Sequence, residues 1–339
     1  MHYLITGHTG FKGSWLSLML HLQGHEVSGF SLDPLSKSLF QEAGLQDIFS
    51  HDVRGDIRHK DVLSNAVKEI DPEVVIHLAA QPLVRESYRN PVGTYETNVI
   101  GTLNLLEATK QASNLKGTLV VTTDKVYKNR NHLRGYVEND ELGGDDPYSS
   151  SKAAADIATQ SWVKSFNSTP VAIARAGNVV GGGDWATDRI IPDLVKAYSL
   201  GELPKLRYPQ AIRPWQHVLD CLNGYLALTD KMLTDGLTGE WNFGPSIEEK
   251  HDVLDLVQTF AKAWGILDWE NAWIKELSEQ PHEAGFLLLD SSKATSKLGW
   301  KDKLSFSDSI NLTVNWYQQH LESNPRDVTI NQIKGYLAI

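Results

Sequence analysis

The chain has 339 residues, of which 41% are hydrophobic and 22% are charged, a composition typical of a globular protein with room for two domains. Its formal net charge of −10 argues against nucleic acid or an anionic membrane surface as a partner. The single cysteine, Cys221, excludes an internal disulfide framework, and no apolar stretch approaches the roughly 18 residues of a membrane span, so we expect a cytoplasmic protein.

The first elements predict a nucleotide-binding turn. Residues 2–6 are expected to form a strand and residues 11–23 a helix, with Gly7, Gly10 and Gly13 between them and in the first helical turn. Glycines let the backbone approach a pyrophosphate, and free amides at the start of a helix attract its negative charge. The position between strand and helix therefore favours a dinucleotide site over an ordinary glycine turn.

An acidic residue follows the predicted second strand. That strand covers residues 26–32, and Asp33 comes 20 residues after Gly13. A carboxylate there accepts hydrogen bonds from the adenosine ribose and repels a 2′-phosphate, which favours NAD over NADP. A turn aspartate before Pro34 is the alternative interpretation.

Two further strands are expected near residues 51–54 and 74–78. The second is apolar apart from His77, which we interpret as a core or loop histidine rather than a catalyst.

The fifth strand, residues 118–122, is β-branched and apolar, which predicts burial on both faces. Thr123, Asp124 and Lys125 then emerge at its carboxyl end, the edge of an open α/β sheet where ligands react. Tyr148 and Lys152 are four residues apart in a segment that Pro147 starts and alanines favour as helix, so both lie on one face. A lysine ammonium close to a tyrosine favours tyrosinate. The pair is therefore expected to remove a proton from a hydroxyl while hydride leaves.

Two long helices are predicted near residues 93–112 and 148–166. In the second, apolar side chains recur every four residues and form a stripe, which either covers the sheet or packs against a second subunit. The stripe consists of Ala154, Ala158, Trp162 and Phe166. A strand is expected over residues 171–174. The tryptophans at 241, 264, 269, 273, 300 and 316 are interpreted as core residues rather than base-stacking platforms.

Five segments spread over most of residues 1–300 resemble the extended short-chain dehydrogenase/reductases. Within that superfamily they resemble the nucleotide-sugar 4,6-dehydratases, most closely those acting on CDP-glucose. The segments are Gly7-His-Thr-Gly-Phe-Lys-Gly-Ser-Trp-Leu16, His77-Leu-Ala-Ala-Gln-Pro-Leu-Val-Arg85, Thr123-Asp-Lys125, Gly181-Gly-Gly-Asp-Trp185 and Arg213-Pro-Trp-Gln-His217.

The resemblance implies an α/β fold, a Rossmann-type doubly wound parallel sheet with a smaller, mostly C-terminal α/β substrate domain. The NAD-binding domain would comprise residues 1–176 and about 213–235. The nucleotide-sugar domain would comprise residues 177–212 and about 236–339. The resemblance also implies a homodimer, or a dimer of dimers, whose subunits pack through a four-helix bundle. It further implies a role in deoxysugar biosynthesis for O-antigen lipopolysaccharide.

The resemblance assigns roles to individual residues. The implied catalytic residues are Thr123, Asp124, Lys125, Tyr148 and Lys152. The implied NAD contacts are Gly7, Thr9, Gly10, Phe11, Lys12, Gly13, Asp33, Asp56, Ile57, Leu78, Ala79, Ala80, Thr122, Tyr148 and Lys152. The implied substrate contacts are Arg85, Ser87, Asn98, Asn178, Arg189, Arg213 and His217. A solvated helix residue remains the alternative for Lys12, and a surface ion pair the alternative for each arginine; no metal site is predicted.

The implied reaction is loss of water from CDP-glucose without net redox change. Tyr148 would take the carbon-4 hydroxyl proton, Lys125 the carbon-5 hydrogen, and Asp124 would protonate the departing carbon-6 hydroxyl, while Thr123 would bond the carbon-4 oxygen. Many 4,6-dehydratases have glutamate where Lys125 stands, which leaves the sugar nucleotide open. A nucleotide-sugar 4-epimerase needs Tyr148 and Lys152 but not Asp124 and Lys125. A non-catalytic NAD-binding regulator needs none of the four.

Overall fold

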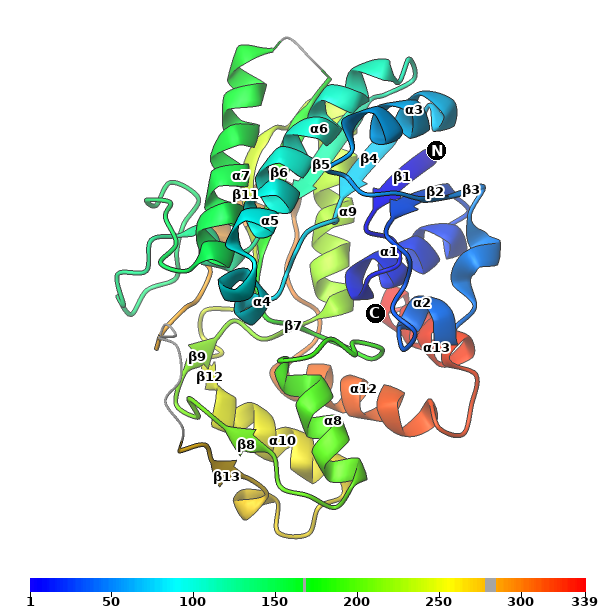
Figure 1. Ribbon diagram of the computed structural model, residues 1–339. Helices are drawn as coiled ribbons and strands as arrows, with labels where there is room; N and C mark the ends of the chain where they lie inside the picture. Colours follow the sequence, from blue (N-terminus) through cyan, green and yellow to red (C-terminus); the bar gives the residue numbers. More distant parts are fainter. Residues whose placement is uncertain (167–168, 278–284) are drawn as a thin grey trace.

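Seven parallel strands form the central sheet of the computed structural model, which describes residues 1–166, 169–277 and 285–339 (Figure 1). Their order across the sheet is β11-β6-β5-β4-β1-β2-β3. The strands are β1 (His2–Thr6), β2 (Glu26–Ser31), β3 (His51–Arg54), β4 (Val74–His77), β5 (Gly117–Val121), β6 (Val171–Ala176) and β11 (Gly239–Phe243). The order reverses between β1 and β4, and such a reversal is where open α/β sheets bind ligands.

Alternating side chains of the strands fill two hydrophobic layers. Leu4 and Val75 belong to one core cluster, whereas their neighbours Ile5, Val74 and Ile76 belong to another on the opposite face. This alternation arises because successive side chains of a strand point to opposite sides of the sheet. The sheet is therefore covered on both faces, and the Rossmann-type doubly wound fold is confirmed.

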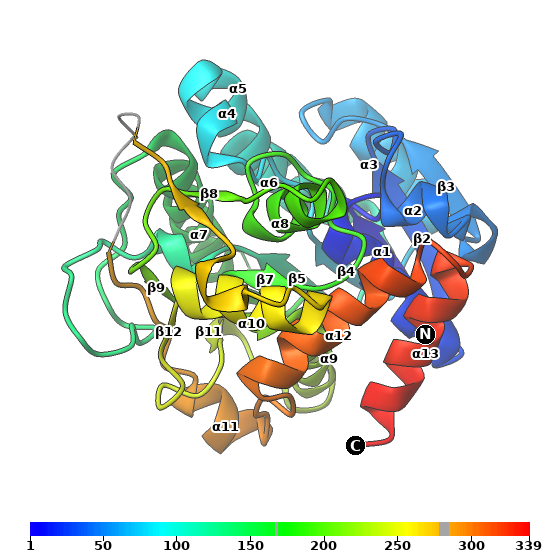
Figure 2. The same ribbon diagram turned by 90° about the horizontal axis from the view of Figure 1, so that it is seen from below.

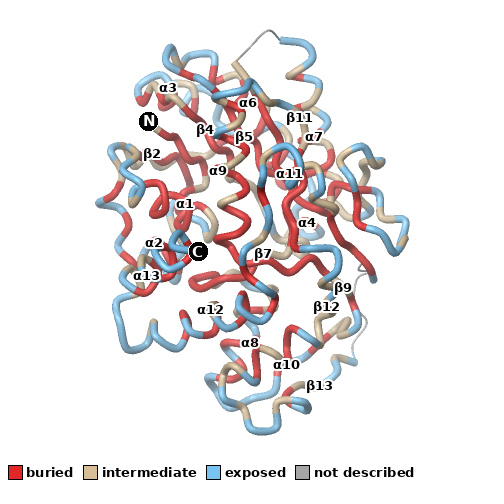
Figure 3. Tube along the Cα trace, turned by 180° about the vertical axis from the view of Figure 1, so that it is seen from behind, coloured by how far each residue is buried: buried red, intermediate tan, exposed pale blue. Residues whose placement is uncertain are grey.

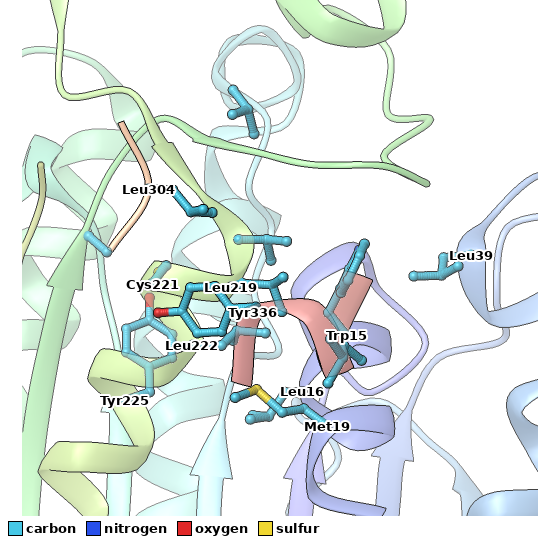
Figure 4. Close-up of a cluster of buried hydrophobic side chains, with 14 of the residues drawn as sticks. Trp15, Leu16, Met19, Leu39, Leu219, Cys221, Leu222, Tyr225, Leu304 and Tyr336 are labelled. Carbon is cyan, nitrogen blue, oxygen red and sulfur yellow. The ribbon is translucent and has the colours of Figure 1, made fainter. Parts of the chain in front are cut away.

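Helices cover both faces of the sheet. The helices on one face are α3 (Lys60–Ile70), α6 (Gly101–Ala108) and α7 (Pro147–Ser165), and those on the other are α1 (Phe11–Leu22) and α9 (Val218–Asp235). Figure 4 shows the second layer, where Trp15 and Met19 of α1 lie near Leu222 and Tyr225 of α9. In Figure 3 the strands form the buried centre of this part of the chain.

A second group of elements lies below the carboxyl ends of the strands in Figure 1. Its helices are α8 (Ile190–Ser199), α10 (Val253–Trp264) and α12 (Phe306–Gln319). Its short strand pairs are β7 (Val179–Val180) with β10 (Gln216–His217), β9 (Ile212–Arg213) with β12 (His251–Asp252), and β8 (Lys205–Leu206) with β13 (Ile274–Lys275). Short helices α2 (Leu39–Glu42), α4 (Val84–Arg89) and α11 (Ser292–Leu298) complete the structure.

The C-terminal part of the chain returns to the sheet at two places. Strand β11 pairs with β6, although the predicted boundary at about residue 236 assigned it to the second domain. Helix α13 (Pro325–Leu337) packs against α1 and α2 (Figure 2). Backbone hydrogen bonds therefore join β11 to the main sheet. The division into two domains stays a prediction.

The predicted long helix at 93–112 is built from shorter helical pieces. It comprises α5 (Pro91–Tyr95), one π-helical turn (Glu96–Ile100), α6 and a final 3-10 turn. Asn98 lies in the π turn and bonds the Gln81 backbone, and such single turns occur frequently beside functional sites. Among the described residues, no helix combines the length and the apolar character needed to cross a membrane.

Candidate active site

A cleft of about 700 Å³ opens where β1, β4, β5 and β6 end. Gly7, Leu78, Thr122 and Gly177 come from the residues that follow these strands, and all four line the cleft. Its other wall comes from the segment between β6 and β9, including Arg189. The parallel arrangement brings all four strand ends to one edge, so residues far apart in sequence converge there.

The glycine turn fits closely against the end of β4. Gly7 has φ +75°, and a Cβ atom on it would lie 2.7 Å from the backbone nitrogen of Ala79. A Cβ atom on Gly13 would lie 2.2 Å from the Gly7 carbonyl oxygen. A side chain at Gly7 would therefore clash with the residues that follow β4, and one at Gly13 would clash with the turn itself. The start of α1, with its unpaired amides, is left open to the cleft, as a pyrophosphate requires.

Every residue predicted to contact the dinucleotide lines this cleft. Asp33 follows β2, and its carboxylate is 89% exposed at the cleft edge. Asp56 accepts hydrogen bonds from the Arg58 guanidinium, which lowers the pKa of that carboxyl below its ordinary value. Ile57 is buried against Gly101 of α6. The cleft therefore has the polar groups expected for a dinucleotide site.

Tyr148 and Lys152 occupy one face of α7, as their spacing predicts. Asp146 caps the helix by accepting from the Ser149 amide, and Pro147 occupies its first turn. Lys152 is 7% exposed, and its Nζ donates to the Val121 carbonyl oxygen over 2.9 Å. Burial lowers the pKa of Lys152 to about 8, and the charge of Lys12 acts in the same direction. The ammonium is therefore held at the end of β5, beside the predicted reacting edge.

The pKa of Tyr148 is shifted in the direction opposite to the expected lowering. Burial raises the pKa of Tyr148 to about 12, and a hydrogen bond with Thr123 only partly opposes this effect. The Lys152 ammonium bonds the Val121 carbonyl oxygen. The net direction is therefore opposite to the prediction, because removal from water penalises tyrosinate.

Asp124 lies deep in the site, whereas Lys125 is only partly buried. Asp124 is 1% exposed, and its Oδ1 accepts from the Thr123 hydroxyl over 2.9 Å. Its Oδ2 is buried and has no hydrogen-bond partner among the described residues. Lys125 lines the cleft, and among residues 1–166, 169–277 and 285–339 no carboxylate lies within ion-pair distance of its ammonium. The site thus presents a buried carboxyl oxygen with an unused lone pair beside a lysine that is not neutralised by its neighbour.

Four of the predicted substrate contacts line the cleft. They are Arg85, Asn178, Arg189 and Arg213. Arg85 lies 3.1 Å from Asp188, and Arg189 lies 2.9 Å from Asp184, whose charge raises the arginine pKa. Both guanidinium groups therefore have carboxylate partners and still border the cleft.

Ser87, Asn98 and His217 are buried and are not among the residues that line the cleft, and their contact with substrate stays a prediction. Ser87 accepts from the Tyr148 amide, and Asn98 joins the Gln81 backbone to the Ser151 hydroxyl. These two side chains hold the start of α7 in place. His217 caps α9 through the Leu219 amide, and burial lowers its pKa to about 3. They support the site without bordering it.

Comparison with known proteins identifies the family. A family model described as GDP-mannose 4,6 dehydratase matches residues 4–313. The chain belongs to this 4,6-dehydratase family. The resemblance inferred from the five sequence segments is therefore confirmed.

Relatives of this dehydratase cover nearly the whole chain. A CDP-glucose 4,6-dehydratase of Salmonella typhimurium is 43% identical over 325 residues, which are 93% of this chain and 89% of the relative. A dTDP-glucose 4,6-dehydratase of Haemophilus influenzae is 28% identical and covers 94% of this chain and 98% of its own.

Solved structures agree with the fold of the dehydratase. A dTDP-glucose 4,6-dehydratase from Bacillus anthracis, in complex with NAD, has a TM-score of 0.80 and 26% identity over 95% of this chain and 98% of that one. A UDP-glucose 4-epimerase from Thermotoga maritima has a TM-score of 0.82 at 22% identity, covering 95% and 100%. The epimerase shows the fold alone.

The structure of this dehydratase adds a buried ion pair that sequence patterns did not reveal. Arg175 and Asp156 are fully buried and 2.7 Å apart. Asp156 also accepts from the Thr122 hydroxyl, and its charge acts to raise the pKa of Lys152 one turn earlier on α7. An alternating strand pattern suggests an apolar residue at position 175, so only the fold shows why arginine is there.

The cleft of the dehydratase also contains residues that the sequence motifs did not indicate. Gly177 packs against Asp124, so that a Cβ atom there would lie 2.0 Å from the carboxylate. Lys205, Arg207 and Tyr208 line the substrate side. In the sequence these three residues form only a short basic and aromatic run, and such runs are common on protein surfaces. Its position in the cleft depends on the pairing of β8 with β13.

Proposed function

We propose that this chain dehydrates CDP-D-glucose to CDP-4-dehydro-6-deoxy-D-glucose with NAD as its cofactor. The observation that carries the proposal is the convergence of Thr123, Asp124 and Lys125 with Tyr148 and Lys152 in one cleft. The 43% identity to a CDP-glucose 4,6-dehydratase supports the choice of base and sugar. A plain dinucleotide-binding protein has no need for this set of residues.

The cofactor assignment rests on the glycine turn and Asp33. The turn leaves no room for side chains at Gly7 and Gly13, which is the condition for a pyrophosphate to approach the backbone. The Asp33 carboxylate favours free ribose hydroxyls over a 2′-phosphate. When bound, NAD supplies reversible hydride transfer, accepting hydride from carbon 4 of the sugar and returning it to carbon 6.

Tyr148 is the proposed acceptor of the carbon-4 hydroxyl proton. Burial raises the pKa of Tyr148 to about 12, which is too high for efficient proton removal near neutral pH. A positive charge on the bound cofactor, acting together with the Lys152 ammonium, would lower that pKa. The Thr123 hydroxyl, which bonds Tyr148, would also hold the sugar oxygen. The site is thus arranged so that Tyr148 becomes an effective base only in the loaded enzyme.

Asp124 and Lys125 are the proposed pair for the elimination. Oxidation at carbon 4 makes the carbon-5 hydrogen acidic, and Lys125 would remove it as a free amine. Asp124 would give a proton to the leaving carbon-6 hydroxyl and so release water. The unpartnered Oδ2 of Asp124 supports this role, since it leaves one carboxyl oxygen available to substrate. An epimerase requires neither group.

The substrate's diphosphate is assigned to the arginine side of the cleft. The protein carries a formal net charge of −10, so a nucleoside diphosphate must be held by local cations. Arg189 and Arg213 border the cleft on that side, and Asn178 offers an amide. Arg207 joins them as a residue that the motifs did not indicate.

A substrate panel tests the proposed reaction. Purified protein would be incubated with NAD and with CDP-, dTDP-, UDP- or GDP-glucose, and products analysed for the 4-keto-6-deoxy sugar. We expect product from CDP-glucose at the highest kcat/KM. Formation of CDP-galactose alone would establish the epimerase instead. Absence of any reaction with all four would contradict the proposed class of activity.

We also propose a homodimer formed through α7 and the neighbouring helical run. Trp162 of the predicted stripe is buried against the sheet, whereas Phe166 is 45% exposed. Ile157 is 53% exposed on α7, and Ile100 is 49% exposed on the neighbouring run. Sedimentation of the wild type should give a dimer mass, and Ile157→Glu should shift it toward the monomer. A wild-type monomer at micromolar concentration would refute the dimer.

The cellular role follows from the product. A 4-keto-6-deoxy sugar nucleotide is a precursor of deoxysugars, and we propose that it serves the synthesis of O-antigen lipopolysaccharide. The unpaired, buried Cys221 suits the reducing cytoplasm, where we place the enzyme.

A further inference from the structure

Arg54, the last residue of β3, lies beside Asp33, which lines the cleft. Its Nε is 3.7 Å from Asp33 Oδ1, and its side chain is 28% exposed. Asp33 is the residue that the proposed function places at the adenosine ribose. A guanidinium this close to the ribose position bears directly on which dinucleotide the cleft accepts.

The Arg54 side chain is held by three neighbours from separate segments. Its Nη2 donates to Asp52 over 2.7 Å, and its Nη1 lies 3.0 Å from Nε2 of the buried His8. Its guanidinium carbon lies 5.1 Å from the centre of the Phe40 ring in α2. These contacts use Nη1 and Nη2, so that Nε is the nitrogen directed to Asp33. The guanidinium is therefore in place before any nucleotide binds.

We infer that Arg54 is a second determinant of cofactor choice, a preformed 2′-phosphate contact that the Asp33 carboxylate neutralises. This inference rests on the proposed use of a dinucleotide by this cleft. In the wild type, Asp33 repels a 2′-phosphate and also occupies the Arg54 guanidinium. Removing the negative charge of Asp33 would leave the Nε edge of that guanidinium available to one oxygen of a 2′-phosphate, while Nη1 and Nη2 keep their partners.

A substitution of Asp33 alone changes two things together: the repulsion of a 2′-phosphate and the availability of the Arg54 guanidinium. If repulsion alone excludes NADP, loss of the Asp33 charge improves NADP binding whether or not Arg54 is present. If Arg54 is a preformed contact, most of the improvement requires the guanidinium. A double-mutant cycle measures the difference.

The experiment measures dissociation constants of NAD and NADP by calorimetry, with nucleotide-free protein and no sugar nucleotide. The proteins are wild type, Asp33→Asn, Arg54→Met, and Asp33→Asn with Arg54→Met. Methionine keeps apolar contact with Phe40 while removing the charge. We expect Asp33→Asn to improve the NADP-to-NAD affinity ratio by at least about 10-fold, the range of a charge-assisted hydrogen bond. Adding Arg54→Met to Asp33→Asn should lower the NADP-to-NAD affinity ratio again, by at least about fivefold.

The matched control is Arg326→Met in the Asp33→Asn background. Arg326 is 27% exposed, similar to Arg54, and is paired with Asp47 away from the cleft. It should leave the gain unchanged. If Arg54→Met fails to fold, Arg54→Lys replaces it. A lysine keeps the charge, but its single ammonium cannot bond Asp52 and a 2′-phosphate at the same time. The NADP-to-NAD affinity ratio of the Asp33→Asn protein should therefore fall by at least about threefold.

Two results would overturn the inference. One is a double variant that binds NADP as well as Asp33→Asn alone. The other is an equal loss from the Arg326 control, which would indicate a general effect of net charge. Wild-type protein that binds neither dinucleotide would instead overturn the proposed function, and the inference with it.

Discussion

Gly177→Ala tests whether the position of Asp124 matters to the chemistry. A Cβ atom at residue 177 would lie 2.0 Å from the Asp124 carboxylate, which must retreat by about 1.4 Å to reach an ordinary contact of 3.4 Å. Asp124 is 1% exposed and bonded to Thr123, so it has little room to move. Because a misplacement of about 1 Å can cost about 100-fold in rate, we expect turnover of CDP-glucose to fall by about that factor.

The assay follows both halves of the reaction in the same sample. Oxidation at carbon 4 depends on Tyr148, so CDP-glucose should still reduce the bound cofactor, seen as near-ultraviolet absorbance of reduced nicotinamide. Formation of the 6-deoxy product should be slow. Gly335→Ala is the control, because an added methyl group on this exposed helix residue meets nothing within 4 Å. Wild-type turnover in Gly177→Ala would refute the reasoning that Asp124 must occupy its present position.

Three further predictions concern single side chains. Tyr148→Phe should lower turnover by at least about 100-fold while NAD affinity, measured by titration, stays near the wild-type value, because only the proton acceptor is lost. In the Lys125→Met variant, CDP-glucose should still reduce the bound NAD, but no 6-deoxy product should form. Solvent deuterium should not enter carbon 5. Product formation at the wild-type rate would show that Lys125 has only a structural role. Burial lowers the pKa values of His77 and His217 to about 3, so the unfolded chain binds more protons below its histidine pKa of 6.5. Stability should therefore fall with falling pH from about 7 to 5, by about 2 kcal/mol for each of these histidines. Urea unfolding of His217→Gln at both pH values should show a smaller fall, and an equal fall would contradict the neutral state of His217.

The sequence by itself determined the order and type of the main elements. Strands β1 to β5 lie within about one residue of their predicted ranges. The pattern is clearest for β4 and β5, which are short and mostly apolar runs. The spacing of Tyr148 and Lys152 likewise placed both on one face of α7, since helical geometry is local. The glycine turn was predictable for the same reason: its sterics involve neighbouring residues and one adjacent strand end.

Only the tertiary structure decided which polar residues border the cleft. Arg207 and Arg213 border the cleft, whereas His217 is buried in the core. The sequence pattern around these residues does not show which of them borders the cleft. The direction of the Tyr148 pKa shift also depended on burial by distant segments, which outweighed the effect expected from Lys152. β11 joined the main sheet because its backbone found a partner in β6, more than sixty residues earlier in the chain. Burial and long-range pairing arise from the whole packed chain, so a local motif cannot specify them.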